Sequence, residues 1–382
     1  MTDKTKRNPR RRLLVMSLLI IGLIIALISA GMYLLRPGGA QIVFVAPDDA
    51  GADQLWLVNL NDLEHVRQLT NVDSPVLFTG LRVASDNQRV LLHLVEGRNH
   101  SLWTMNPETG ATQHISDCEN NSSCTRTSLS FDGRWLALED HETITESLNE
   151  ITLRIIDLDS GTSETIFSLQ SDDPDIGDVL IGWIEDSGYL VYRSNPENAP
   201  ATVTIYDVSS DQIIDTVEII DMAGRFTTRF SPDGQYYSYR IFQQNFRIQF
   251  YEIYAINEPD TALFSTLPVQ ESTTQDRHAL QDWHPDSEHI LVANGRSDNG
   301  VIILNEMRIN NILDNSSELI FSNDERYTYP TASFNYDGSQ ILYYRHNVES
   351  DQGEILIYDI ESGEHILLPF AGAFPQWVNG GR

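Results

Sequence analysis

Apolar residues occur along this chain in two arrangements: one long run near the N-terminus and many short runs further on. The long run, residues 13–35, holds 23 residues without a charge. A helix of that length extends for about 34 Å, which is enough to cross a hydrocarbon core of about 30 Å. The short runs, of which Ile42-Val43-Phe44-Val45 is the first, show no long 3.6-residue period. They predict β-strands and few helices.

Charge changes sign across the long run. Residues 1–12 carry six basic side chains against Asp3, whereas beyond Arg36 there are 18 basic and 54 acidic residues, a net charge of −36. The positive-inside rule then predicts a cytoplasmic basic tail (1–12), a transmembrane signal anchor (13–35), a short linker (36–40) and an extracytoplasmic body (41–382) on a single-pass cell-membrane protein. A cleaved signal peptide is the rival interpretation. It is disfavoured because the apolar run continues past Ser29-Ala30-Gly31, beyond the usual 7–15 residues.

The body repeats one element, in which an aromatic or apolar residue precedes an Asp-containing turn and an apolar strand. The clearest copy is Phe230-Ser231-Pro232-Asp233-Gly234. Gly accepts positive φ at low cost and Asp bonds the turn backbone, so the pair suits a tight reversal between antiparallel strands. We therefore interpret the repeated aspartates as structural turn residues rather than as metal ligands or acids. They are Asp86, Asp132, Asp186, Asp233, Asp286 and Asp337.

A second strand-like element recurs downstream and ends at a polar hairpin turn. Its seven copies begin at Leu55, Leu102, Leu153, Val203, Tyr251, Val301 and Ile355. Seven copies against six clear Asp turns indicate that the body starts inside one unit, and that the segment 374–380 supplies the missing opening strand. Closing the ring in this way removes exposed sheet edges. The sequence thus predicts an all-β protein of seven four-stranded blades, with six or eight as alternatives, closed by N- and C-terminal strands that share one blade.

These repeats resemble those of TolB-type β-propellers, also called WD40-like propeller repeats. The resemblance rests on Phe230–Gly234 with its following strand and on Leu102-Trp103-Thr104-Met105-Asn106, and it extends over residues 41–382. It implies a propeller fold. It does not imply one function, because such propellers serve as binding platforms, periplasmic partners and accessory domains of peptidases.

Composition narrows the function classes. The chain has 382 residues and a formal net charge of −30, which argues against nucleic-acid binding because phosphate neutralisation needs clustered Lys and Arg. No His-Glu-x-x-His and no Gly-x-Ser-x-Gly motif occurs, so we expect no catalytic residues and no cofactor. Cys118 and Cys124 are predicted to form a local disulfide in an oxidising compartment. Residues 172–178 hold four carboxylates, yet they lack the order of a calcium loop, so Ca²⁺ is only a weak alternative to a solvated loop.

Aromatic residues occupy the same place in several units, just before the Asp turn. They are Trp183, Phe230, Trp283, Phe334 and Trp377. Packing between blades explains them, and lining of a central pocket is the alternative. Basic residues near the clearest repeat, among them Arg225, Arg229 and Arg240, are suited to an anionic partner or to pairing with acidic neighbours. The sequence favours a non-enzymatic binding or scaffold module for a protein, peptide or glycan. A propeller enzyme, lactonase- or lyase-like and metal-dependent, with its site in the central channel, is the alternative.

Overall fold

The computed structural model describes residues 40–71, 77–83, 89–96, 99–118, 123–145, 148–171, 179–184, 187–194, 202–218, 225–243, 248–266, 276–298, 301–322, 327–347, 350 and 352–378. All regular structure in these ranges is β-strand, which confirms the predicted all-β class. No helix within them is long and apolar enough to cross a membrane. The predicted basic tail and anchor, residues 1–35, lie outside the described ranges.

The described strands form six sheets, five of four strands and one of eight, in which every described pairing but one is antiparallel. The first sheet contains β28 (Ala373–Val378), β1 (Gln41–Pro47), β2 (Asp53–Asn59) and β3 (Asp62–Gln68). The second contains β4 (Leu77–Val83), β5 (Val90–Glu96), β6 (Asn99–Met105) and β7 (Thr112–Cys118). The third contains β8 (Ser123–Leu129), β9 (Trp135–Thr145), β10 (Leu148–Asp157) and β11 (Ser163–Ser171). The fourth contains β12 (Leu180–Trp183), β13 (Tyr189–Ser194), β14 (Thr202–Asp207) and β15 (Gln212–Glu218).

The eight-stranded sheet consists of two halves joined at one parallel pair, Gln249 with Arg277. One half contains β16 (Arg225–Phe230), β17 (Tyr236–Gln243), β18 (Ile248–Ala255) and β19 (Glu258–Ser265). The other contains β20 (Asp276–Trp283), β21 (His289–Asp298), β22 (Val301–Asn311) and β23 (Ser317–Ser322). The last sheet contains β24 (Tyr327–Phe334), β25 (Gln340–Asn347), β26 (Gln352–Asp359) and β27 (His365–Leu367). We call each four-stranded sheet, and each half of the larger one, a unit.

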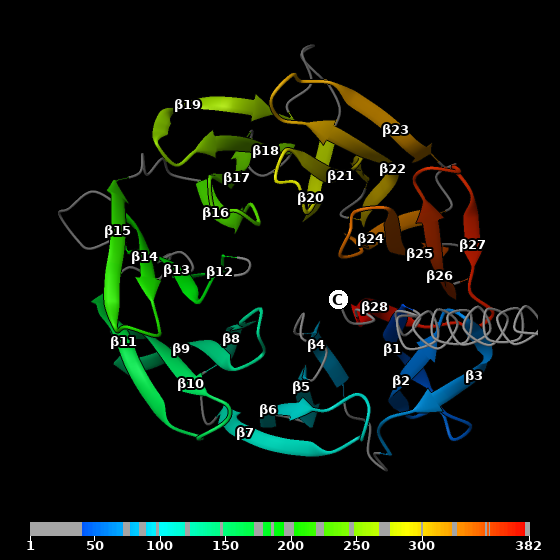
Figure 1. Ribbon diagram of the computed structural model, residues 1–382, viewed down its shortest axis with the longest axis horizontal. Helices are drawn as coiled ribbons and strands as arrows, with labels where there is room; N and C mark the ends of the chain where they lie inside the picture. Colours follow the sequence, from blue (N-terminus) through cyan, green and yellow to red (C-terminus); the bar gives the residue numbers. More distant parts are fainter. Residues whose placement is uncertain are drawn as a thin grey trace, which may run out of the picture.

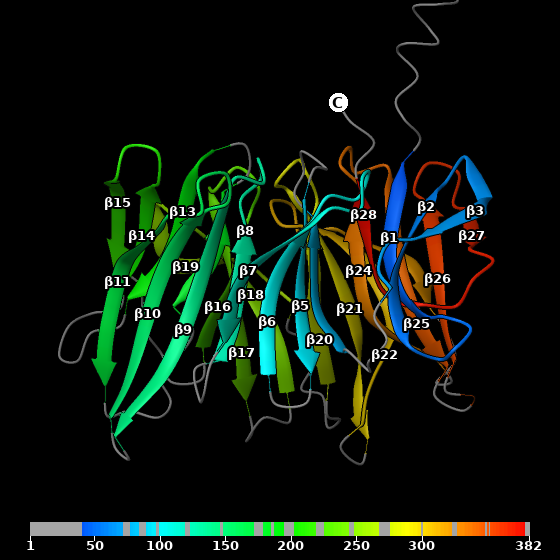
Figure 2. The same ribbon diagram turned by 90° about the horizontal axis from the view of Figure 1, so that it is seen from below.

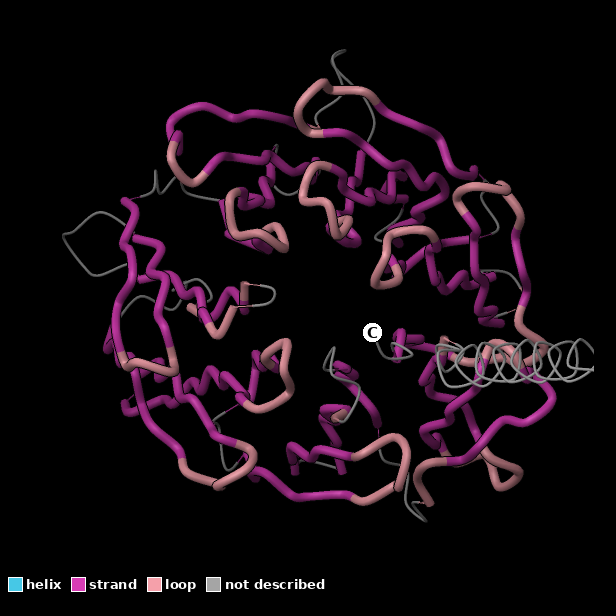
Figure 3. Tube along the Cα trace, viewed as in Figure 1, coloured by secondary structure: helices cyan, strands magenta, loops and turns pink. Residues whose placement is uncertain are grey.

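The units stand side by side in a closed ring, with one strand of each next to the axis (Figure 1). The innermost strands are β28, β4, β8, β12, β16, β20 and β24, and the fourth strand of each unit lies at the perimeter. Strands and short connections account for the whole described trace around the ring (Figure 3). β28 pairs with β1 through Val378–Gln41 and Trp377–Ile42, so the C-terminal strand completes the unit begun by the N-terminal strands, as the unequal repeat counts predict.

The turn between the first and second strand of a unit has the same structure wherever it is described. The backbone N–H of its first residue, Ser130, Ser231, His284 or Asn335, donates to the carbonyl of the residue five positions later. The fourth residue has positive φ and is Gly133, Gly234 or Gly338 in three turns. In the remaining turn it is Ser287, with φ +64°. This left-handed conformation is costly for a residue with a Cβ, so a serine there needs a compensating contact.

The turn after the third strand is capped by an Asn or Asp at the end of that strand. Six described turns have such a cap: the side-chain Oδ1 of the capping residue accepts a hydrogen bond from a backbone N–H two or three residues further along the chain. The capping residues are Asn59, Asn106, Asp157, Asp207, Asn311 and Asp359. One of the seven copies of the second strand-like element was placed too early in the sequence. The segment Val301–Asn305 lies in β22, but Asn311 is the residue equivalent to Asp157. The strands of the hairpin β21–β22 have 10 and 11 residues, a length that only β9–β10 matches among the described hairpins, so the first apolar run of β22 does not reach the capped end.

The hydrophobic core lies between neighbouring units. In one cluster, Val191 and Val203 pack with Tyr237 and Phe250 of the next unit, and all four are at most 3% exposed. The other clusters also combine residues of two adjacent units. Burial of both sheet faces explains why the strands are near-continuous apolar runs.

Candidate functional site: the axial pocket

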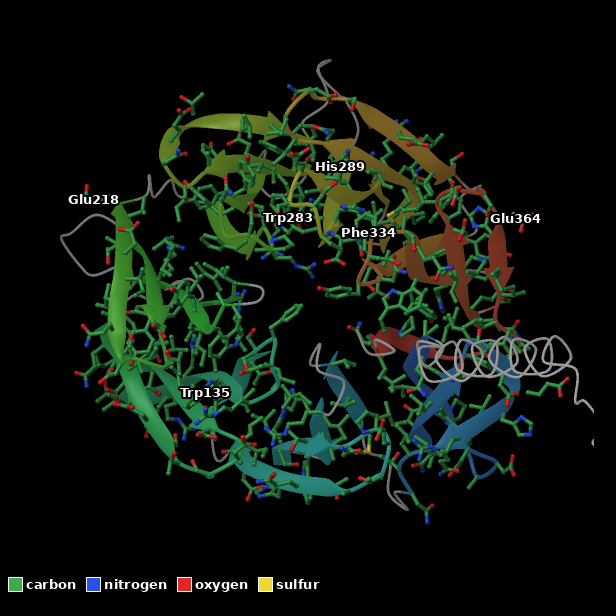
Figure 4. The ribbon with its side chains drawn as sticks, in the orientation of Figure 1. Trp135, Glu218, Trp283, His289, Phe334 and Glu364 are labelled. Atoms are coloured by element: carbon green, nitrogen blue, oxygen red, sulfur yellow. The ribbon has the colours of Figure 1, made fainter. Side chains whose placement is uncertain are left out.

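A pocket of about 420 Å³ lies on the ring axis. Every innermost strand, or the turn that follows it, contributes lining residues, from Val83 in β4 to Trp377 in β28. Figure 4 shows Trp283 and Phe334 facing the middle of the ring, whereas Glu218 and Glu364 lie at its outer edge. The lining residues cluster where the innermost strands end, so the pocket opens at this end of the ring, which we call the pocket face.

The repeated aromatic residues have both roles that the sequence offered as alternatives. All five line the pocket. They also pack between units: Trp283, Phe334 and Trp377 are only 6–8% exposed. The indole Nε1 of Trp183 donates to the Ser128 carbonyl of the preceding unit at 3.0 Å, and Trp377 does the same to Ser333 at 3.3 Å. The end of an innermost strand lies between the inter-unit core and the ring axis, so one aromatic side chain there both packs between units and lines the pocket.

The mouth of the pocket is apolar. The second residue of each described turn lines it, and these residues are Phe131, Pro232, Pro285 and Tyr336. Tyr336 is 38% exposed. Other polar lining groups are engaged within the turns: the hydroxyls of Ser130 and Ser231 donate to Asp132 and Asp233 at 2.6 and 2.7 Å. An apolar rim with few polar groups inside is typical of a small-ligand site, as is the volume.

Arg229 and Asp282 bring opposite charges into the pocket from neighbouring units. Nη1 of Arg229 lies 3.5 Å from Oδ1 of Asp282 and also donates to the carbonyl of Gln281. Oδ2 of Asp282 accepts from the backbone N–H of Phe334 at 3.0 Å. The side chains keep 46% and 30% of their surface exposed. Within the described residues no other group bonds Nε or Nη2 of Arg229, so part of its guanidinium fork is open to a ligand.

A bulge in each of the two strands β16 and β20 brings Arg229 and Asp282 to the pocket. The register of β16 against β17 shifts between Thr227 and Arg229, and that of β20 against β21 shifts between Leu280 and Asp282. Such bulges bend a strand and re-aim the next side chain. The bulged residue Gln281 also joins three units, because its carbonyl accepts from Arg229 and its Oε1 accepts from the Ala332 N–H at 3.1 Å.

Burial raises the pKa of Asp282 above its ordinary value, against the opposing effects of the Arg229 guanidinium and the Phe334 N–H. Asp282 lines the pocket, and its side chain keeps 30% of its surface exposed. Arg229 was noted from the sequence, with an acidic neighbour as one interpretation. Asp282 was missed. The only sequence feature that marks Asp282 is its position directly before the repeated aromatic residue Trp283. Gly182 and Arg229 occupy the same position in their units.

The described turn aspartates bond their own turns. Oδ1 of Asp132 accepts from the Arg134 N–H at 3.1 Å, and Asp233 and Asp337 accept the equivalent bonds at 3.0 and 2.9 Å. Asp86 and Asp186 lie outside the described residues. So do residues 172–178, the weak Ca²⁺ candidate, and the side chains of Cys118 and Cys124, so the disulfide stays a prediction.

Asp286 belongs to a group that the sequence did not single out. Potential ligand atoms of His284, Asp286 and His289 lie within 4.8 Å of one another. Hydrogen bonding argues against a metal there. Asn311 accepts two backbone N–H groups through Oδ1, so its Nδ2 faces Nε2 of His289 at 3.1 Å. The His289 proton then sits on Nδ1, which donates to Asp286 at 2.7 Å instead of binding a cation.

Comparisons with known proteins bear on the fold. No protein-family model and no curated protein sequence matches this chain. Among solved structures, oligogalacturonate lyase from Vibrio parahaemolyticus is similar at 15% identity and a TM-score of 0.58, over 84% of this chain and 87% of that one. The β-propeller domain of the Trilobed protease from Pyrococcus furiosus is similar at 16% identity and a TM-score of 0.53, over 80% and 85%.

TolB from Acinetobacter baumannii is similar at 14% identity over 89% of this chain and 66% of that one. Its TM-score of 0.46 is too low to carry an argument. At identities of this order, likeness extends to the fold and not to function. The chain is therefore similar to β-propeller proteins, and the ring of sheets described above is a β-propeller.

Proposed function

We propose that this chain is a membrane-anchored, extracytoplasmic β-propeller that binds a ligand in its axial pocket without transforming it. The ligand is part of a protein, a peptide or a glycan. The observation that carries the proposal is the pocket itself: every innermost strand lines it, and an open arginine fork lies inside an apolar rim. Binding sites commonly combine such an apolar wall with a few oriented polar groups.

The finer architecture belongs to the same proposal. We take the five four-stranded sheets and the two halves of the larger sheet as seven blades, the number that the seven copies of the second sequence element suggest. The recurring Asp turn supports kinship with TolB-type propellers. The anchor and the compartment rest on the charge reversal across residues 13–35, with the net charge of −36 carried by the part of the chain that we place outside the membrane.

Tryptophan fluorescence offers a direct test, because three of the six tryptophans, Trp183, Trp283 and Trp377, line the pocket. The full chain in detergent is titrated with a panel of short peptides and oligosaccharides. We expect a saturable change with at least one class. Arg229→Ala should weaken that affinity about tenfold or more, because a charge-assisted hydrogen bond contributes about 1.5–3 kcal/mol.

The matched control is Arg308→Ala, which removes an arginine that is 31% exposed, pairs with Glu306 on β22 and is not among the pocket-lining residues. It should leave affinity unchanged. Binding that both substitutions affect equally, or that neither affects, would place the ligand elsewhere. Melting temperatures of both variants distinguish a lost contact from a damaged fold.

A propeller enzyme is the second candidate, favoured by one observation: a carboxyl with a raised pKa lies beside an arginine in a pocket. Such pairs are common at catalytic sites. One similar structure, at a TM-score of 0.58, is an oligogalacturonate lyase in complex with manganese. Turnover of a lactone or uronate oligosaccharide that is lost with Asp282→Asn and with EDTA would replace the binding proposal by this one.

A further inference from the structure

The described chain enters the ring at the pocket face. Gln41, the first residue of β1, pairs with Val378, the last residue of β28, and Ile42 pairs with the pocket residue Trp377. The carbonyl of Ala40 is held by the Leu60 N–H at 2.9 Å. In Figure 2, β1 begins at the same end of the ring at which β28 ends. Strand pairing therefore places the chain entry beside the pocket mouth.

The link between this entry and the predicted anchor is short. Four residues, 36–39, separate the apolar run from Ala40. Whatever its conformation, a link of that length spans at most about 14 Å, because an extended chain covers about 3.3–3.6 Å per residue. If residues 13–35 cross the bilayer, the pocket face is the face turned to the membrane. A ligand must then reach the pocket through the narrow space between ring and bilayer.

The pocket face is acidic. The described turns at this end carry Asp132, Asp233, Asp286, Asp337, Asp62, Glu108, Asp157, Asp159, Asp207, Asp211, Asp314, Asp359, Glu361 and Glu364. Three arginines beside them are already engaged: Arg134 pairs with Asp157 at 2.9 Å, Arg89 pairs with Asp159, and Arg67 donates to the carbonyls of Pro107 and Glu108. Hydrogen bonds from turn serines hold the pKa of Asp207, Asp337 and Asp359 below the ordinary value, so they stay ionised.

Resting on the proposed function, we infer that the axial pocket and the acidic turns around it form a membrane-facing docking surface for a basic juxtamembrane segment of an integral membrane protein. Lysines or arginines of that segment pair with the turn carboxylates. An apolar side chain beside them enters the pocket between Phe131 and Tyr336. Anionic lipid headgroups are repelled by the same carboxylates and do not compete.

Orientation is tested with the full chain in phosphatidylcholine vesicles containing a nitroxide-headgroup lipid. A fluorescent amino acid replaces Tyr336 at the pocket mouth or, as a control, Ile144 near the far end of β9 at the opposite face. The two side chains are similarly exposed, 38% and 43%. We expect quenching at position 336 to be at least twofold stronger than at 144. Equal or reversed quenching overturns the orientation.

The partner is tested in the same vesicles with a photo-crosslinking amino acid at position 336. One probe is a single-span peptide with four lysines on its extracytoplasmic flank, and the control probe has four serines there. We expect at least fivefold more crosslinking to the lysine probe, and its loss when salt rises from about 50 to 500 mM. Equal crosslinking overturns the basic partner. In vesicles that also contain phosphatidylglycerol, stronger capture of that anionic lipid than of the lysine probe overturns it too.

The two proposals fail in different ways. A soluble ligand whose binding depends on Arg229, together with unquenched position 336, leaves the pocket as the site and removes the membrane-facing arrangement. Strong quenching and lysine-dependent crosslinking, with affinity unchanged in Arg229→Ala, retain the acidic turns as a membrane-facing docking surface and remove Arg229 and the pocket around it from the binding site.

Discussion

The hydroxyl of Ser287 accepts a hydrogen bond from the backbone N–H of Asp233 at 3.1 Å, which links the turn after β20 to the turn after β16 in the neighbouring unit. Ser287 has φ +64° at a position where Gly133, Gly234 and Gly338 stand in the equivalent turns. The inter-unit bond is the compensating contact for a backbone conformation that a residue with a Cβ adopts at a cost.

Two substitutions separate these opposing effects. Ser287→Ala keeps the backbone strain and loses the bond, so we expect it to lower the free energy of unfolding by about 1–2 kcal/mol. Ser287→Gly loses the same bond but relieves the strain, so its stability should lie within about 0.5 kcal/mol of the unsubstituted protein. Urea-unfolding midpoints at constant slope measure both. Equal losses in the two variants would contradict this account.

Gly338 makes the corresponding contact with His284 of the preceding unit. A Cβ built on Gly338 would lie 2.0 Å from Nε2 of His284, and φ is +76°. We expect Gly338→Ala to destabilise by about 2–4 kcal/mol, because overpacking adds to strain. Gly363→Ala is the control: φ is +70°, but the nearest atom, Oη of Tyr358, is 3.8 Å away. It should cost only about 1 kcal/mol.

A substitution of His284 tests whether the clash with its ring causes the loss of stability in Gly338→Ala. Replacing it with serine, the residue found at the equivalent positions 130 and 231, removes the ring that the new methyl group meets. The double variant His284→Ser, Gly338→Ala should recover part of the stability lost in Gly338→Ala, as measured by thermal unfolding. No recovery would assign the whole loss to backbone strain.

The turns were predictable from sequence because each depends on residues a few positions apart. Asp132, Gly133 and the hydroxyl of Ser130 specify their reversal locally, and the spacing of such groups along the chain indicates a ring. The end of β22 was not predictable in the same way. An apolar run does not reveal how far a hairpin extends, and only the cap at Asn311 locates its turn.

The pocket could be predicted only in part. The repeated aromatic residues suggested packing or a pocket as alternatives, because the sequence does not show that an innermost strand ends where core and axis meet. The pairing of Arg229 with Asp282 could not be predicted from the sequence, for a different reason. Arg229 and Asp282 are 53 residues apart and meet because two strands, each with a bulge, belong to adjacent units. Closure of the ring creates that proximity.

We expect Asp282 to lower the stability of the folded protein while it contributes to ligand binding. Burial disfavours its ionised form and so raises its pKa, and its stabilising contribution is lost as pH rises from the ordinary value of 3.8 through the folded pKa. Asp282→Asn should therefore raise the melting temperature at pH 7, and the gain should shrink as pH falls toward the ordinary value of 3.8. Ligand affinity should fall in the same variant. A lower melting temperature at pH 7 would mean that the bonds to Arg229 and Phe334 outweigh desolvation.

Asp157 should behave in the opposite sense. Its hydrogen bond from Arg134, at 2.9 Å, and the turn N–H groups of Asp159 and Ser160 hold its pKa below 3.8. For a depressed pKa, the stabilising contribution is complete above the unfolded value and is lost as pH falls through the folded value.

A double-mutant cycle with Asp157→Asn and Arg134→Gln measures this contribution across pH. Asparagine retains an acceptor for the turn, so the cycle isolates the charged interaction with Arg134. We expect a favourable coupling at pH 6 that declines below pH 3.8 and vanishes once Asp157 is protonated. A coupling near zero at pH 6 would show that Arg134 stabilises the turn through its stacking on Trp135, with the guanidinium 4.5 Å from the ring centre, and not through the carboxylate.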